Sequence, residues 1–281
     1  MELKDKTILV TGSTDGVGRV VAERLGAAGA RMLVHGRDEG RGRATVAAIE
    51  AKGGKAEFLV ADLASLAEVR RLAETVRTRT DRLDILINNA GVGTGGQGAK
   101  RQVSADGYEL RFAVNYLAGF LLTSELLPLL KASAPARIVN VASAGQQAID
   151  FDDVMLTHGY SGVRAYCQSK LAQILFTIDL AEQLQGTGVT INALHPASYM
   201  DTTMVRQAGV TPWSSVETGA DAIVNLAASS ALEGRAGLYF DGQRESRADA
   251  QAYDEKARRQ LHALSVELIE RPSSKSREQQ S

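Results

Sequence analysis

The sequence predicts one α/β domain, with a doubly wound parallel sheet of about seven strands and helices on both faces. Two observations lead to this prediction. Short apolar runs alternate with helical patterns along the chain, and most of these runs are continuously apolar, as expected for strands that are covered on both faces. Neither a shift in composition nor a repeat of fixed period divides the 281 residues.

The individual elements follow in order from this pattern. The strand candidates are Thr7–Val10, Arg31–His35, Glu57–Ala61, Ile85–Asn88, Arg137–Ala142, Val189–Leu194 and Gly237–Phe240. Helical patterns cover Val17–Ala28, Asp38–Lys52, Ser65–Thr80, Ala113–Leu130, Tyr166–Leu184, Val216–Ser229 and Glu245–Glu270. Two connections, Gly91–Lys100 and Gly145–Gly162, are unusually long, which makes them candidate active-site loops. We expect the domain to span residues 1–270 and the polar segment 271–281 to be a disordered tail.

Composition narrows the class of protein. Charged residues make up 23% of the chain and hydrophobic residues 44%, which is typical of a soluble globular protein. The 32 Lys and Arg are balanced by 33 Asp and Glu, so no bulk positive field attracts nucleic acid or an anionic membrane. The single cysteine, Cys167, excludes an intramolecular disulfide framework, and no ligand spacing predicts a metal site. The expected partner is a small molecule.

No membrane segment is expected from the sequence. The first residues lack the apolar core of a secretory signal. Polar residues and a proline interrupt the longest apolar stretch, Ala113–Leu130, so we interpret it as a core helix rather than a membrane span. The sequence therefore predicts a cytoplasmic protein.

A glycine-rich turn joins the first strand to the first helix. It reads Thr11-Gly-Ser-Thr-Asp-Gly-Val-Gly18, with the spacing G-x-x-x-G-x-G. Glycines at this place let the backbone approach a pyrophosphate at the helix N-terminus. A purely structural turn would also use glycine, but the flanking strand and helix favour a Rossmann-type dinucleotide site. Its expected members are Gly12, Ser13, Thr14, Asp15, Gly16, Val17 and Gly18.

Two further motifs follow the third and fourth strands. They are Asp62-Leu63 and Asn88-Asn-Ala-Gly91, and both lie at strand carboxyl ends, where open α/β sheets bind ligands. Together with the glycine spacing they resemble the short-chain dehydrogenase/reductase family, which uses these motifs to hold the adenine and to line the cofactor cleft. The resemblance implies cofactor contacts from Asp62, Leu63, Asn89, Ala90 and Gly91.

The end of the second strand predicts NADP(H) as the cofactor, with NAD as the weaker alternative. By the same resemblance, Gly36 stands where NAD-preferring members carry an acid, and Arg37 follows it. An arginine at this place accommodates the 2′-phosphate of NADP. The alternative is that Asp38 accepts the ribose hydroxyl, although its more ordinary role is the N-cap of the next helix. Asp15 in the glycine turn adds an unfavourable negative charge.

Tyr166 and Lys170 are the candidate acid–base pair. Their spacing of four residues puts both side chains on one helix face, and a neighbouring cation lowers the pKa of a phenol toward neutrality. Ser143 ends the fifth strand and Asn115 lies in the long helix before it, which is the order of the catalytic tetrad in the family that the sequence resembles.

The resemblance implies a role for each of these residues in hydride transfer between a nicotinamide and a carbonyl or alcohol carbon. Tyr166 would give or take the oxygen proton, and Lys170 would hold the nicotinamide ribose. Ser143 would hydrogen-bond the reacting oxygen, and Asn115 would fix a water that connects Lys170 to solvent. Pro196 and Thr202 are carried over as cofactor-side contacts.

The sequence also departs from the plainest members of the family. Tyr166 follows Ser143 by 23 positions, a longer interval that resembles the retinol-dehydrogenase-like and anthracycline-ketoreductase-like branch. Ala197 replaces the usual glycine after Pro196. His195 is expected to be structural, because the tetrad leaves no role for another base.

The segment after the sixth strand predicts a lid at about residues 197–215. Its apolar side chains would line a site for a bulky, uncharged ketone or aldehyde, and they are Tyr199, Met200, Met204, Val205, Val210 and Trp213. The alternative is that these residues only pack the lid onto the domain.

Two alternative functions remain open, and the sequence also suggests an oligomeric state. The alternatives to a reductase are an epimerase or dehydratase of the extended type and a non-catalytic NADP-sensing regulator. Family analogy and two unusually apolar helices, Ala113–Leu130 and Tyr166–Leu184, predict a homodimer or homotetramer.

Overall fold

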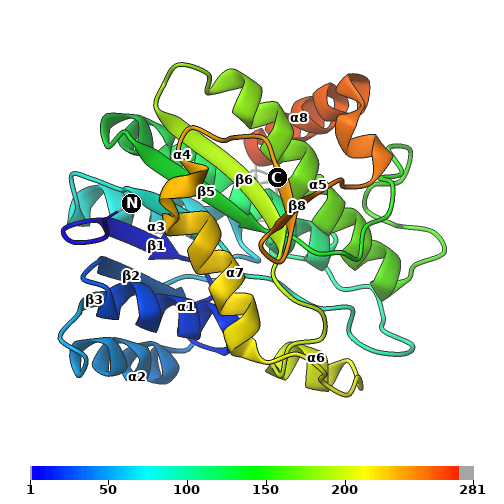
Figure 1. Ribbon diagram of the computed structural model, residues 1–281. Helices are drawn as coiled ribbons and strands as arrows, with labels where there is room; N and C mark the ends of the chain where they lie inside the picture. Colours follow the sequence, from blue (N-terminus) through cyan, green and yellow to red (C-terminus); the bar gives the residue numbers. More distant parts are fainter. Residues whose placement is uncertain (1, 272–281) are drawn as a thin grey trace, which may run out of the picture.

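One eight-stranded sheet forms the centre of the computed structural model, which describes residues 2–271 (Figure 1). The strand order is β3-β2-β1-β4-β5-β6-β7-β8. The strands are β1 Thr7–Val10, β2 Arg31–Gly36, β3 Lys55–Val60, β4 Ile85–Asn88, β5 Ala136–Val141, β6 Val189–His195, β7 Tyr239–Asp241 and β8 Arg244–Ser246. Neighbours are parallel except β7 and β8, which pair antiparallel. The predicted doubly wound parallel sheet is confirmed, with β8 as one strand more than expected.

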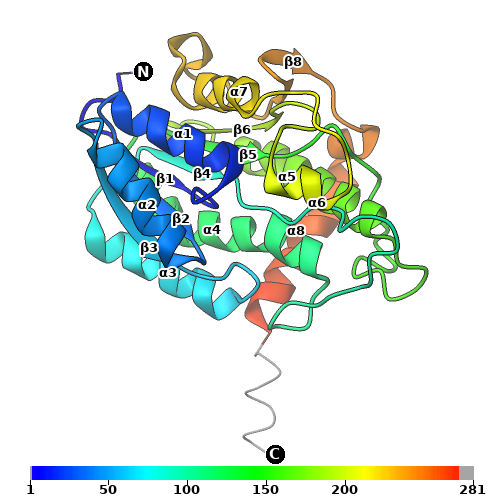
Figure 2. The same cartoon turned by 90° about the horizontal axis from the view of Figure 1, so that it is seen from below.

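Helices cover both faces of this sheet (Figure 2). α1, α2 and α7 pack on one face, α3, α4 and α5 pack on the other, and α8 lies against α5. The helices are α1 Gly16–Ala27, α2 Glu39–Glu50, α3 Leu66–Arg79, α4 Ala118–Ala132, α5 Gly162–Gln183, α6 Thr203–Gln207, α7 Val216–Ala228 and α8 Glu255–Glu270. The short helices are the π-helical η1 Phe112–Leu117, η2 Ser230–Leu232 and η3 Ala250–Tyr253.

The central strand β1 shows why the strand sequences are continuously apolar. Ile8 and Val10 belong to the core under α1 and α7, whereas Leu9 belongs to the core under α3 and α4, and all three are fully buried. Burying such a side chain contributes roughly 1.5–3 kcal/mol. Val10 pairs with Val34 of β2 and Ile87 of β4, so these strands end at one edge, where the predicted ligand-binding turns begin.

The C-terminal region corrects one prediction. The expected single helix Glu245–Glu270 is instead strand β8, helix η3 and helix α8. The side chain of Asp249 accepts a hydrogen bond from the Gln251 amide, and Asp254 accepts one from the Lys256 amide. Each aspartate caps a new helix start, which divides the pattern in two. The predicted tail 271–281 lies outside the described residues except for Arg271.

Helix α8 covers the apolar surfaces of η1, α4 and α5. The Tyr116 hydroxyl and Ser265 Oγ are 2.6 Å apart, and the rings of Phe120 and His262 meet edge to face at 5.9 Å. The helical stretch Phe112–Ala132 is long and apolar enough to cross a membrane by length and composition alone, yet 61% of its most apolar part is buried inside the protein. In this fold it is a core helix.

Candidate active site

The glycine turn between β1 and α1 has room for backbone only. Gly12 and Gly16 adopt φ angles of 65° and 53°, which favour glycine. A Cβ on Gly12 would lie 2.9 Å from Ala90 Cα, and one on Gly18 would lie 2.4 Å from the Gly12 carbonyl oxygen. Side chains at Gly12 and Gly18 would collide with neighbouring backbone, and the positive φ of Gly16 favours glycine, so the turn keeps its shape only with glycine at these positions. The result is a turn of bare backbone at the N-terminus of α1, the kind of place that a pyrophosphate can approach.

Thr11 and Asn89 fasten this turn to the segment after β4. Thr11 Oγ1 accepts hydrogen bonds from the amides of Asn89 and Ala90 at 3.0 and 3.1 Å. Asn89 Nδ2 donates to the carbonyl oxygens of Thr11 and Gly12 at 2.8 and 3.2 Å. The structure thus brings together two motifs that are far apart in the sequence. Thr11 was not predicted as a site residue, because its role depends on this long-range contact.

Ser13 and His35 support the turn from beneath. The buried Ser13 hydroxyl donates to the Val10 carbonyl at 2.7 Å and accepts from the His35 amide at 3.0 Å. His35 Nδ1 accepts the Gly12 amide at 3.1 Å, and its Nε2 lies 3.2 Å from the carbonyl oxygen of Ala61. Burial lowers the pKa of His35 to about 4, so the ring is neutral at physiological pH. Ser13 therefore braces the turn with a side chain that is fully buried.

Asp15 caps α1 and connects three segments. Its carboxylate accepts the Gly16 amide at 2.8 Å, Arg41 Nη1 at 3.1 Å and Thr203 Oγ1 of the lid at 2.9 Å. Arg41 is a second cation beside the glycine turn that the sequence did not single out. The ordinary interpretation of Asp38 is confirmed, because its side chain caps α2 by accepting the Arg41 amide at 2.9 Å.

Arg37 follows β2 at the edge of the predicted adenosine site. Its side chain is 72% exposed and lies 3.7 Å from the Asp62 carboxylate. Gly36 leaves room for Thr14, whose side chain would be 2.5 Å from a Cβ at that position. A larger residue at position 36 would therefore require the Thr14 side chain to move. Two other predicted contacts, Leu63 and Val17, are buried and partly buried apolar side chains that pack in the core.

Ser143 and Tyr166 meet at the carboxyl end of β5. Helix α5 begins at Gly162 with Ser161 as its N-cap, so Tyr166 lies in its second turn, although the sequence predicted that the helix would start at Tyr166. Burial raises the pKa of Tyr166, and its hydrogen bond to the Ser143 side chain only partly offsets this effect. The predicted lowering of this pKa is therefore wrong: burial raises the pKa of Tyr166 and is the largest cause of the shift.

Lys170 lies one turn along α5 and is buried. Its Nζ donates to the Val141 carbonyl at 2.8 Å and to Gln173 Oε1 at 3.0 Å, and it is 5.8 Å from the centroid of the Tyr166 ring. Burial lowers the pKa of Lys170 to about 7, since neither hydrogen-bond acceptor carries a charge. Gln173 is a neighbour of the catalytic group that sequence reasoning missed.

Asn115 lies in the π-helical segment η1. Its Oδ1 accepts the Val92 amide at 2.6 Å, and its Nδ2 donates to the Val92 carbonyl at 3.1 Å and to Ser169 Oγ at 2.9 Å. A Cβ on Gly91 would lie 3.3 Å from Asn115 Oδ1 and 3.6 Å from Lys170 Nζ. Gly91 therefore lets the segment after β4 pass directly beside two members of the predicted tetrad.

The predicted lid lies over the glycine turn and the segment after β4. Buried Pro196 directly precedes it, Thr202 caps α6, and the Thr202 methyl would be 3.3 Å from a Cβ on Gly16. The rings of Tyr199 and Trp213 meet edge to face at 5.0 Å, and Trp213 is 74% exposed. The lid thus reaches two parts of the predicted cofactor site.

His195 lies just before the lid and outside the catalytic contacts. Its Nε2 is 3.0 Å from Ser198 Oγ, and burial lowers its pKa. This arrangement is consistent with the structural role expected for His195. Among the described residues, 2–271, no three His, Cys, Asp or Glu side chains gather as possible metal ligands.

Comparison with known proteins identifies the family. Residues 6–212 match the family model for short chain dehydrogenases. Human retinol dehydrogenase 13 is 38% identical to this chain, over 94% of this chain and 84% of its own length. The chain therefore belongs to the short-chain dehydrogenase/reductase family, in the retinol-dehydrogenase-like branch, as the resemblance predicted.

Two solved structures share the fold across most of their length. The Pseudomonas aeruginosa RhlG/NADP active-site complex is 30% identical with a TM-score of 0.71, and covers 85% of this chain and 95% of its own. The landomycin C-6 ketoreductase LanV, with bound NADP and rabelomycin, is 29% identical with a TM-score of 0.68, and covers 86% of this chain and 96% of its own. The family is one of oxidoreductases, and these neighbours are NADP complexes.

Proposed function

We propose that this oxidoreductase transfers a hydride between the nicotinamide of NADP(H) and a carbonyl or secondary alcohol carbon, and that it reduces a ketone or aldehyde on a bulky, apolar compound. The observation that carries this proposal is the contact between the Ser143 and Tyr166 side chains at the carboxyl edge of the sheet, with Lys170 buried beside the Tyr166 ring.

The glycine turn fits the cofactor. It offers unobstructed backbone at the N-terminus of α1, where the partial positive charge of the helix favours a pyrophosphate. Gly12, Gly16 and Gly18 would hold the pyrophosphate, and the segment Asn89–Gly91 would line the path toward Lys170. When bound, the nicotinamide supplies the hydride.

The side chains supply binding and proton transfer. Ser143 and Tyr166 present two hydroxyl groups to a carbonyl oxygen. Because burial raises the pKa of Tyr166, the phenol keeps its proton at neutral pH and can donate it to that oxygen. Lys170 is charged below its pKa of about 7, and its charge stabilises the phenolate that remains. Asn115 holds Val92 and thereby the backbone next to Lys170.

Preference for NADP rests on two arginines. Arg37 is exposed at the end of β2, next to Gly36 at the position where NAD-preferring members of the family carry an acid, and Arg41 lies in the first turn of α2. Arg41 pairs with Asp15 on the surface, and an exposed pair of this kind contributes only about 0–1 kcal/mol. A 2′-phosphate can therefore recruit both guanidinium groups at little cost. The NADP complexes of the structural neighbours support this assignment.

The substrate class follows from the lid. Tyr199, Met204 and Trp213 are exposed apolar side chains on it, and Arg206, the nearby cation, pairs with Asp201 at 2.7 Å. The names of the similar proteins, retinol dehydrogenase and a ketoreductase with bound rabelomycin, support an apolar, ring-containing substrate. The test is NADPH consumption with small keto acids, aromatic ketones and polycyclic ketones. Preference for the keto acids would reject the substrate class.

The same assay separates the alternatives. An NADP-sensing regulator would bind NADPH without consuming it, and an epimerase or dehydratase would convert its substrate without net consumption of NADPH. The retained Tyr166 and Lys170 argue against the regulator, and the G-x-x-x-G-x-G spacing of the glycine turn argues against the extended type. The homodimer or homotetramer and the cytoplasmic location stay predictions. Part of the apolar surface of α4 and α5 is packed against α8, and light scattering would determine the assembly.

A further inference from the structure

A buried ion pair lies outside the catalytic group. Glu109 is 1% exposed and Arg111 is 2% exposed, and their closest charged atoms are 3.5 Å apart. Burying two charges is costly unless hydrogen bonds satisfy both of them. The partners of this pair therefore indicate its purpose.

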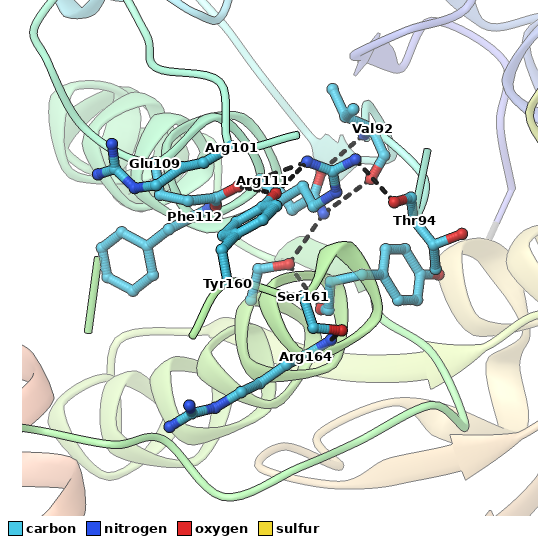
Figure 3. Close-up of polar contacts among 12 residues, drawn as sticks. Val92, Thr94, Arg101, Glu109, Arg111, Phe112, Tyr160, Ser161 and Arg164 are labelled. Carbon is cyan, nitrogen blue, oxygen red and sulfur yellow. Dashed lines mark hydrogen bonds and ion pairs between the residues drawn. The ribbon is translucent and has the colours of Figure 1, made fainter. Parts of the chain in front are cut away.

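Each nitrogen of the Arg111 guanidinium has an acceptor (Figure 3). Nε donates to the Gly93 carbonyl at 2.8 Å, Nη2 donates to the Thr94 carbonyl at 2.8 Å, and Nη1 donates to the Tyr160 hydroxyl at 2.6 Å. The Tyr160 hydroxyl in turn donates to Glu109 Oε1 at 3.0 Å. Only the planar fork of an arginine can bind two successive carbonyls and a hydroxyl in this way.

This cluster joins the two long loops that the sequence marks as unusual. Gly93 and Thr94 belong to Gly91–Lys100, and Tyr160 belongs to Gly145–Gly162. The two loops also touch directly, because a Cβ on Gly162 would lie 2.1 Å from the Thr94 carbonyl oxygen. Arg111 therefore fixes the first loop against the start of α5, the helix that carries Tyr166.

The segment Val92–Thr94, here called the wall segment, lies between the catalytic group and the lid. Asn115 binds both backbone polar groups of Val92. A Cβ on Gly93 would be 2.7 Å from Met204 Cγ of the lid. A shift of the wall segment would change the space between the lid and the reacting carbon.

We propose that Arg111, together with Glu109 and Tyr160, is a positioning group that fixes the wall segment and so determines which carbonyl compounds fit the site. This inference rests on the proposed reductase function, which would place the substrate between the lid and the Ser143–Tyr166 pair, beside the wall segment. It assigns a purpose to the buried charges, which do not touch the reacting atoms.

The test compares three variants of the full-length protein. The double variant Glu109→Gln/Arg111→Met removes both charges, so no unpaired charge stays buried. Tyr160→Phe removes only the bridging hydroxyl and is the milder change. The control is Arg164→Met, since Arg164 pairs with Asp150 at 2.8 Å between the second loop and α5 without an observed contact to the wall segment.

Two readouts separate positioning from stability. We expect the double variant to raise KM for a bulky ketone about tenfold with kcat within about threefold, and to leave NADPH affinity unchanged. Hydrogen–deuterium exchange should accelerate in residues 92–100 and stay unchanged in residues 11–18. Tyr160→Phe should change both readouts in the same direction by a smaller factor, and Arg164→Met should change neither.

Unchanged KM and unchanged exchange at residues 92–100 in a folded double variant would overturn the inference. If the double variant does not fold, the same two readouts on Tyr160→Phe decide. If the unmodified protein consumes no NADPH with any carbonyl compound, the proposed function fails, but the exchange measurement still shows whether Arg111 holds the wall segment.

Discussion

The side of the site that we assign to the cofactor and the side that we assign to the substrate are built differently. The cofactor side is backbone without side chains at Gly12, Gly16 and Gly18, anchored on short turns that directly follow β1 and β4. The substrate side consists of two long loops and a lid, held by side chains such as Arg111 that reach across the domain. The fixed backbone of the first would suit one kind of ligand, whereas the loops and lid of the second can vary with little change to the fold.

The largest expected effect is on the chemical step and not on binding at either side of the site. Tyr166→Phe should lower kcat by about 10²–10⁴-fold, because it removes the proton donor. NADPH affinity should stay within about twofold, since the hydroxyl makes no phosphate contact. Steady-state kinetics and a fluorescence titration of NADPH measure the two quantities. Wild-type turnover in this variant would contradict the proposed proton path.

A change in the glycine turn should strongly weaken the binding of NADPH. In Gly18→Ala the new Cβ would lie 2.3 Å from Asn89 Nδ2 and 2.4 Å from the Gly12 oxygen, and the second is backbone that cannot move alone. We expect NADPH affinity to fall at least about 100-fold. Gly40→Ala in α2, where the nearest atom is Asp38 Oδ1 at 3.3 Å, is the control and should bind normally.

The support beneath the glycine turn should make stability depend on pH. Burial lowers the pKa of His35 to about 4 from 6.5, so the unfolded chain binds this proton first as pH falls. The contribution of His35 is complete above pH 6.5 and should decrease by on the order of 3 kcal/mol between pH 6.5 and 4. Denaturant titrations over this range would measure it. His35→Gln should flatten the curve, and an equally steep curve would assign the effect to other groups.

Cofactor selectivity should respond more moderately. Arg37→Ala should lower NADPH affinity by roughly ten- to 100-fold and leave NADH affinity nearly unchanged, because a charge-assisted phosphate contact contributes on the order of 1.5–3 kcal/mol. Arg41→Ala should act in the same direction by a smaller factor, since Arg41 must leave Asp15. A preference for NADH in the unmodified protein would contradict the assignment.

The smallest expected effect concerns the hydrogen bond between Thr203 of the lid and Asp15 of the glycine turn. Thr203→Val removes the hydrogen bond from the lid to Asp15. An exposed bond of this kind is worth at most about 1 kcal/mol, so we expect a change in NADPH release of about fivefold or less. Stopped-flow measurement of release would detect it. Thr218→Val, which removes a hydroxyl contact at the start of α7, is the control.

Some elements of the fold could be predicted from the sequence and others could not. The alternation of strands and helices and the glycine turn depend on local patterns, so both could be predicted. Strand β8 and the split before α8 could not, because two single residues, Asp249 and Asp254, cap new helices inside one amphipathic pattern. Helix α5 starts early for the same reason, with Ser161 as its cap.

The missed site residues share a physical cause. Thr11, Arg41 and Gln173 act through partners that only the fold brings near. Thr11 opens the glycine motif, but the motif does not indicate the role of its side chain, and no motif contains Arg41 or Gln173. Arg111 had no sequence signal either, since an arginine among apolar residues usually lies at a surface. The pKa of Tyr166 was mispredicted because helix spacing gives the position of a neighbouring charge but not the depth of burial.

The lid contains an intrinsic fluorophore, Trp213. Trp213 is the single tryptophan of the chain, and 74% of its surface is open to water. Indole emission shifts to shorter wavelength when water leaves the ring, and no other indole contributes a background. A compound that closes the lid over Trp213 would therefore shift the intrinsic fluorescence of the unmodified protein. The variant Trp213→Phe, which lacks this emission, is the control.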